Sequence, residues 1–143
     1  MTKQEQPGLG APAHQRILIV DDNEDAADSL GMLLEAAESD VRIGYSGREA
    51  LRLFHEFDPA FVLLDIGMPD VDGYEVARTI RSRYPERHPV LIAFTGWGQE
   101  ADRIRARVAG FDHHLVKPTD LRTLKAILGM TAGVSLSPAD RGA

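Results

Sequence analysis

Five short apolar runs alternate in this chain with segments that have the periodicity of amphipathic helices, and this alternation restricts the possible fold strongly. The apolar runs span residues 16–20, 41–45, 61–65, 90–94 and 115–116. Helical patterns with apolar residues three and four positions apart follow at residues 25–38, 46–56, 74–84, 99–109 and 119–128. A strand–helix unit repeated five times predicts an α/β fold, with a parallel sheet covered by helices on both faces. The fourth helical segment is mostly polar, and its apolar positions at helical spacing are Ala101, Ile104 and Val108.

Length and charge limit the class of protein. The 143 residues, 43% of them hydrophobic, suit one domain with a single core, and the net charge of −6 argues against a nucleic-acid-binding surface. The chain has no cysteine, and it has neither an apolar run of membrane length nor an apolar signal core. We therefore expect a cytoplasmic protein with a disordered tail at residues 1–15, a domain at residues 16–130 and a flexible tail at residues 131–143. No segment is left for an output domain.

Polar side chains stand at the end of four of the five predicted strands. Asp21 and Asp22 follow the first strand, Asp65 ends the third, Thr95 follows the fourth and Lys117 follows the fifth. The carboxyl ends of parallel strands lie on one edge of the sheet, where open α/β folds bind their ligands. The sequence thus predicts three carboxylates, one hydroxyl and one ammonium around a single point.

This set of groups favours Mg²⁺ and phosphoryl chemistry. Three adjacent carboxylates repel one another, and a hard divalent cation with oxygen ligands relieves the repulsion. No Cys or His follows these strands directly, which argues against zinc. A carboxylate beside Mg²⁺, with Lys117 and Thr95 in reach, is suited to accept a phosphoryl group as an acyl phosphate. A plainer interpretation is that Asp65 begins a turn before Gly67 and Pro69.

Four sequence motifs carry a family resemblance. They are Ile-Leu-Ile-Val-Asp-Asp-Asn at 17–23, Leu-Leu-Asp-Ile-Gly-Met-Pro-Asp-Val-Asp-Gly at 63–73, Phe-Thr-Gly at 94–96 and Val-Lys-Pro at 116–118. In this order and on these elements, the chain resembles the receiver domains of two-component response regulators, including the chemotaxis regulators. The resemblance implies a flavodoxin-like doubly wound (βα)5 fold with the sheet order 2-1-3-4-5.

The resemblance also implies roles for individual residues. Asp65 matches the phosphorylated aspartate, Thr95 the switch hydroxyl, and Lys117 the lysine that pairs with the phosphoryl group. The metal site for Mg²⁺ would consist of Asp21, Asp22, Asp65 and Gly67: Asp22 binds the metal directly, Asp21 acts largely through a metal-bound water, and Gly67 contributes its backbone carbonyl. The Lys117–Pro118 bond is expected to be cis.

The implied function is signalling. The phosphoryl donor would be a histidine kinase or a histidine phosphotransfer protein, and the recipient of the signal a downstream protein target, with no nucleic acid or membrane involved. The protein would not be an enzyme beyond its own phosphorylation and dephosphorylation. An aspartyl-phosphate hydrolase is an alternative, but that class typically has an acid two residues after its nucleophile, where this chain has Gly67. An inactive receiver-like interaction domain is a further alternative.

Two positions near the expected site are unusual. His114 stands three residues before the lysine, where the family usually has Tyr or Phe, and it is either a solvent-facing residue of an edge strand or a switch residue that titrates near neutral pH. A metal pair of His113 and His114 is disfavoured, because adjacent strand residues point to opposite faces. Trp97, two residues after Thr95, is expected to be exposed and to influence how long the phosphoryl group persists.

Overall fold

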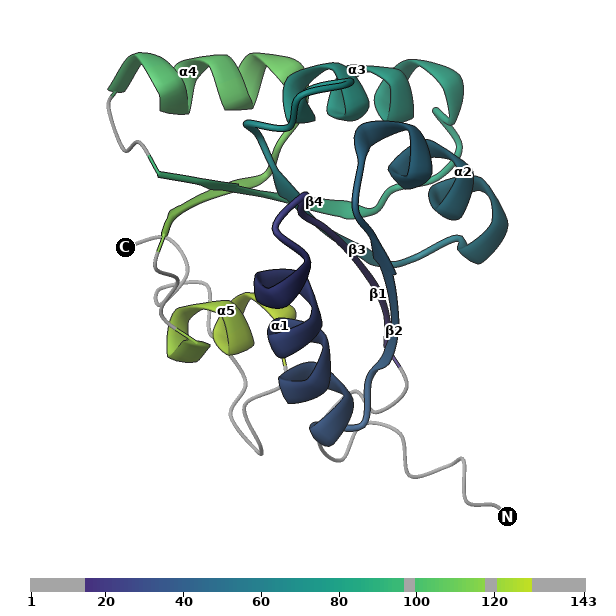
Figure 1. Ribbon diagram of the computed structural model, residues 1–143. Coiled ribbons are helices and arrows are strands. Elements are labelled where there is room, and N and C mark those ends of the chain that lie inside the picture. The colour runs from purple at the N-terminus through teal and green to yellow at the C-terminus, as the bar shows by residue number, and fades with distance from the viewer. Residues whose placement is uncertain (1–14, 97–99, 118–120, 130–143) are drawn as a thin grey trace.

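The computed structural model describes residues 15–96, 100–117 and 121–129, and it contains five parallel strands and five helices in alternation (Figure 1). The sheet order is β2-β1-β3-β4-β5, which confirms the predicted flavodoxin-like doubly wound fold. The strands are β1 (Arg16–Val20), β2 (Asp40–Gly44), β3 (Phe61–Asp65), β4 (Val90–Thr95) and β5 (His113–Val116). The helices are α1 (Glu24–Ala36), α2 (Gly47–Phe57), α3 (Gly73–Arg83), α4 (Glu100–Ala109) and α5 (Leu121–Leu128).

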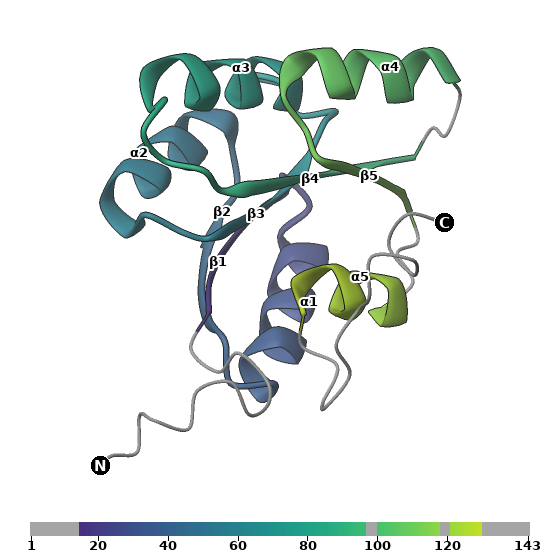
Figure 2. The ribbon, with the colours of Figure 1, turned by 180° about the vertical axis from the view of Figure 1, so that it is seen from behind.

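The helices divide into two layers, one on each face of the sheet. Figures 1 and 2 show α1 and α5 on one face and α2, α3 and α4 on the other. Alternate residues of the central strands enter one or the other of two apolar clusters, because successive strand side chains point to opposite faces. In β3, for example, Val62 and Leu64 pack toward α2 and α3, whereas Phe61 and Leu63 pack toward α1 and α5.

Strand β3 occupies the centre of the sheet and is buried along its whole length. It pairs with β1 on one side and β4 on the other, and residues 62–64 are 0% exposed. A strand covered on both faces requires an uninterrupted apolar sequence, which is what Phe61–Leu64 provides. Asp65 is therefore delivered to the edge of the sheet by a rigid element.

Polar side chains cap the N-termini of α1 and α2. The Asn23 side chain accepts the Ala26 N–H at the start of α1, and the Ser46 hydroxyl accepts the Glu49 N–H at the start of α2. Side-chain oxygens at these positions satisfy backbone donors that have no partner within the helix. Thr119 and Asp120, at the start of the predicted helical segment 119–128, lie outside the described residues, as do both predicted tails except Gln15.

Helix α4 differs from the simple amphipathic pattern. Its apolar residues Ile104 and Val108 are 55% and 81% exposed, and the residues that it buries are the small Ala106 and Ala109. The helix therefore contributes to the core through two alanines, and its larger apolar side chains do not take part in it. The sequence pattern identified the helix but not its buried face.

Candidate functional site

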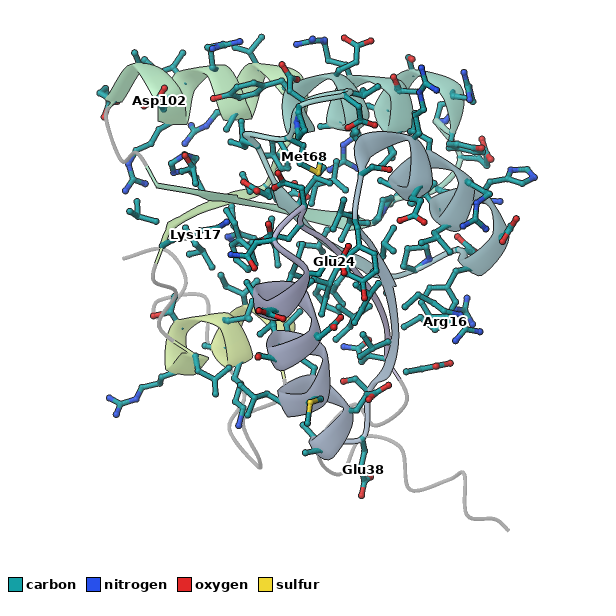
Figure 3. The ribbon with its side chains drawn as sticks, viewed as in Figure 1. Arg16, Glu24, Glu38, Met68, Asp102 and Lys117 are labelled. Carbon is teal, nitrogen blue, oxygen red and sulfur yellow. The ribbon has the colours of Figure 1, made fainter. Side chains whose placement is uncertain are left out.

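The carboxyl ends of β1, β3, β4 and β5 meet at one edge of the sheet, and backbone hydrogen bonds between neighbouring strands fix their register there. Val20 pairs with Leu64, Asp65 with Phe94, and Thr95 with Val116. Past the strands, the Ile66 N–H donates to the Phe94 carbonyl (3.1 Å) and the Lys117 N–H to the Thr95 carbonyl (2.7 Å). Figure 3 shows Glu24, Met68 and Lys117 toward this edge, with Arg16 and Glu38 toward the opposite one.

Three carboxylates gather at this edge. One oxygen from each of Asp21, Asp22 and Asp65 lies within 4.8 Å of the others. The side chains of Asp21 and Asp65 are only 7% and 12% exposed, whereas Asp22 is exposed. The structure therefore brings together the three acids that the sequence analysis predicted as metal ligands.

Lys117 neutralises part of this charge. Its Nζ donates to Asp21 Oδ2 at 3.1 Å and lies 3.5 Å from Asp65 Oδ2. Burial acts to lower the pKa of Lys117, but Asp21 and Asp65 offset this, and the pKa of the ammonium is raised overall. Lys117 is thus held in its charged form between the two carboxylates.

The pKa of Asp65 lies well above the usual range for an aspartate carboxyl group. Burial, followed by the hydrogen bond and charge of Asp21, raises its pKa to about 6, while Lys117 and the Gly67 N–H act in the opposite direction. The Gly67 N–H donates to Asp65 Oδ1 at 3.2 Å, and the Asn23 N–H donates to Asp21 Oδ1 at 3.0 Å. These backbone donors orient both carboxylates without neutralising them.

The donor set fits Mg²⁺. Among the described residues, Lys117 is the cation paired with Asp21 and Asp65, so three carboxylates and one ammonium leave a formal charge of −2 when all are ionised. Carboxylate oxygens are the hard ligands that this ion prefers, and a divalent charge would balance the cluster. Asp21, Asp22 and Asp65 are the carboxylates available to hold it, and the carbonyl of Gly67 stays a predicted ligand.

Comparison with known proteins identifies the family. The sequence matches the response regulator receiver domain family over residues 17–129. The chain belongs to this family.

Solved receiver structures have the same fold. The chemotaxis protein CheY4 of Vibrio cholerae is 24% identical with a TM-score of 0.76, and the match covers 81% of this chain and 97% of that chain. A receiver domain protein from Clostridium thermocellum is 29% identical with a TM-score of 0.73, covering 80% and 90% of the two chains. The receiver domain of Saccharomyces cerevisiae Ssk1, whose structure also contains the histidine phosphotransfer protein Ypd1, is 23% identical with a TM-score of 0.76, covering 82% and 88%.

In this receiver domain, Thr95 and His114 lie on one face of the sheet, and Lys117 lies on the other. Thr95 is 5% exposed at the end of β4. His114 of β5 pairs in register with Ala93, which lies two residues before Thr95 in β4. Residues two apart in a strand share a face, so Thr95 and His114 both belong to the face that α4 covers. The structure therefore places the two predicted switch positions on one side of β4 and β5.

The His114 ring is half-buried, unlike the solvent-facing alternative in the sequence analysis. Neither Nδ1 nor Nε2 has a hydrogen-bond partner among the described residues, although both are shielded from solvent. Burial, followed by the charge of Arg103, lowers the pKa of His114, and Asp102 acts to raise it. The ring is neutral in the folded protein at neutral pH.

We predict that protonation of His114 destabilises this receiver domain. Because its folded pKa lies below the reference value of 6.5, the unfolded chain binds the proton first, and stability is lost as the pH falls below about 6.5. The change in the free energy of unfolding between about pH 8 and pH 6 should be smaller in His114→Phe than in the wild type. Equal pH dependence in both proteins, measured by urea unfolding, would contradict the prediction.

His114 is also proposed to make switching depend on pH. The chemical-shift changes on phosphorylation should differ between about pH 6 and pH 8 in the wild type and not in His114→Phe. Shifts that are the same at both pH values in both proteins would remove this role.

Two predicted features lie outside the described residues, namely Trp97 and the Lys117–Pro118 bond. The sequence analysis also missed the contact between the β3–α3 loop and α2, in which Asp70 binds the N–H groups of Gly47 and Arg48. Asp70 lies inside the quoted motif at 63–73, but its partners are more than 20 residues away, and no local pattern indicates them.

Proposed function

We propose that this receiver domain accepts a phosphoryl group on Asp65, from a histidine kinase or a histidine phosphotransfer protein, and passes the signal to a downstream protein. The observation that carries the proposal is the arrangement of Asp65 with Asp21, Asp22 and Lys117 at the carboxyl edge of the sheet. The expected cytoplasmic location stays a prediction. No helix in the described parts of the chain is long and apolar enough to cross a membrane.

The acceptor step uses groups already in place. A carboxylate oxygen of Asp65 attacks phosphorus, the bond between phosphorus and the donor imidazole nitrogen breaks, and the imidazole leaves with the electron pair. Since the pKa of Asp65 is about 6, the carboxylate is mostly ionised at neutral pH and ready to attack. Lys117, 3.5 Å from Asp65, can pair with the phosphoryl oxygens as negative charge accumulates there.

Bound Mg²⁺ would neutralise charge on the transferring group and orient it for in-line attack. Asp21, Asp22, Asp65 and the Gly67 carbonyl would hold the ion. The buried hydroxyl of Thr95 is proposed to turn toward the phosphoryl group, and His114 to change position with it. These movements would alter the surface of α4, β5 and α5 that a target protein reads.

Incubation with Mg²⁺ and acetyl phosphate tests the proposal. We expect one phosphoryl group per chain by intact-mass measurement, located at Asp65 by peptide mapping and absent when EDTA replaces Mg²⁺. A beryllofluoride salt should give a corresponding adduct. The Asp65→Asn variant is the matched control, since it keeps the shape of the side chain and removes the nucleophile.

The other functions give different results. A hydrolase would release many equivalents of phosphate and turn over simple phosphomonoesters, whereas an inactive interaction domain would form no adduct. The position two residues after Asp65 is Gly67, so the chain offers no acid there to act on a leaving group. Either result, or label in Asp65→Asn at the wild-type level, would overturn the proposed function.

A further inference from the structure

The loop between β3 and α3, residues 66–72, carries Gly67 and is tightly closed on its inner side. The Gly73 N–H donates to the Ile66 carbonyl at 3.0 Å, which brings the two ends of the loop together. A Cβ atom at Gly73 would lie 2.7 Å from Ile66 Cα and 2.8 Å from the carbonyl oxygen of Asp65. The inner side of the loop is therefore held against the backbone of the acceptor residue.

The outer side of the same loop is attached to the N-terminus of α2. Asp70 Oδ1 accepts the Gly47 N–H at 3.1 Å, and Asp70 Oδ2 accepts the Arg48 N–H at 3.2 Å. The backbone N–H groups of Val71, Gly47 and Arg48 lower the pKa of Asp70, and Val71 makes the largest contribution. An ionised carboxylate at a helix N-terminus also interacts favourably with the helix dipole.

Backbone packing makes this attachment close. A Cβ atom at Gly47 would lie 2.2 Å from the Val71 carbonyl oxygen and 2.7 Å from Val71 Cβ. Only glycine allows the first turn of α2 to contact the loop at this distance. The loop is thus clamped between α2 outside and the end of β3 inside.

Helix capping alone does not account for Asp70. The first turn of α2 already has its own N-cap, because the Ser46 hydroxyl accepts the Glu49 N–H at 3.1 Å. Asp70 instead joins two segments more than 20 residues apart in the chain, one of which carries Gly67, two residues from Asp65. Its distinctive effect is on the position of the loop.

We propose that Asp70, supported by Gly47, is a positioning residue for the cation site, which holds the β3–α3 loop so that the Gly67 carbonyl and Asp65 can bind Mg²⁺ together. This inference rests on the proposed function. Asp70 does not ligate the cation itself but acts through the loop. Partners that orient metal ligands in this way typically change metal affinity by about tenfold to a hundredfold when they are removed.

Three variants separate positioning from capping and from charge. Asp70→Ala removes the clamp, and Ser46→Ala removes the other cap of the same helix without touching the loop. Asp72→Asn removes one charge from the same loop but keeps a residue that caps α3 well, where Asp72 accepts the Glu75 N–H at 2.9 Å. The milder Asp70→Asn, which can still accept one of the two N–H groups, covers the case in which Asp70→Ala does not fold.

The measurement is the dissociation constant of Mg²⁺ by titration calorimetry, with thermal unfolding followed separately. We expect Asp70→Ala to weaken Mg²⁺ binding by about tenfold or more and Asp70→Asn by less. Ser46→Ala and Asp72→Asn should stay within about twofold of the wild type, although Ser46→Ala lowers the unfolding temperature.

The outcomes distinguish the two proposals. This inference alone would be overturned if the wild type binds Mg²⁺, Asp65→Asn loses this binding and Asp70→Ala keeps it unchanged. An equal loss of affinity in Ser46→Ala or Asp72→Asn would also overturn it, because capping or charge would then explain the effect. If the wild type shows no Asp65-dependent Mg²⁺ binding, the proposed function fails and the inference fails with it.

Discussion

Asp65→Asn is expected to stabilise the metal-free protein by about 1–2 kcal/mol at neutral pH while abolishing phosphorylation. The pKa of Asp65 is raised from 3.8 to about 6, which corresponds to at most about 3 kcal/mol of destabilisation once the group is ionised. Solvent at the edge of the sheet screens part of this, hence the smaller figure. Asparagine removes the charge and keeps an oxygen for the Gly67 N–H.

The stabilisation produced by Asp65→Asn is expected to depend on pH in a defined range. Because the folded pKa of Asp65 lies above the unfolded value, the folded state binds the proton more tightly, and stability falls as the pH rises from about 4 to about 6. The difference between Asp65→Asn and the wild type should therefore be absent below about pH 4 and constant above about pH 6. Urea unfolding in EDTA across this range measures it, and a variant less stable than the wild type at pH 7 would contradict the prediction.

Addition of Mg²⁺ should make the wild type more stable than Asp65→Asn, which reverses the order of stability expected without the metal. A ligand that binds only the folded state stabilises it by about 2.7 kcal/mol when present at a hundred times its dissociation constant. The wild type would gain this stabilisation, and Asp65→Asn, which lacks one of the three carboxylates, would gain much less. This reversal would show that the destabilisation caused by the acidic cluster is offset by the ion that the cluster is proposed to hold.

Gly73→Ala is expected to lower the free energy of unfolding by about 3 kcal/mol and to impair phosphorylation. The added Cβ would lie 2.7 Å from Ile66 Cα and 2.8 Å from the Asp65 carbonyl oxygen. Both are backbone atoms, which cannot rotate away as a flexible side chain would, so the cost falls at the upper end of the usual range for overpacking. The displacement would be transmitted directly to the backbone of the acceptor.

Gly67→Ala is the matched control for this prediction. It lies in the same loop, but a Cβ atom there would have no neighbour within 4 Å. Its stability without Mg²⁺ should therefore stay within about 0.5 kcal/mol of the wild type, because the added methyl group is exposed and the Gly67 N–H can still bond Asp65. The free energy of unfolding of both variants is measured by chemical denaturation without Mg²⁺. Comparable losses in Gly73→Ala and Gly67→Ala would show that close packing at Gly73 does not cause the destabilisation.

Much of this architecture follows from local sequence patterns. The apolar run Phe61–Leu64 specifies a strand buried on both faces, and strand–helix alternation then requires parallel strands whose carboxyl ends share one edge. That requirement places Asp21, Asp65 and Lys117 at the same edge of the sheet, although they are far apart in the chain. Caps such as Ser46 are also local, because the side chain bonds a backbone group three residues away.

Other properties depend on which elements come to lie side by side. The raised pKa of Asp65 results from burial and from Asp21, and the exposure of Ile104 and Val108 results from the use of two alanines as the contact between α4 and the core. The clamp between Asp70 and α2 joins backbone donors to a carboxylate more than 20 residues away, and backbone donors have no sequence signature. Periodicity and motif spacing thus place the reacting groups at one edge of the sheet. Their ionisation and positioning depend on distances across the packed layers, which no run of neighbouring residues encodes.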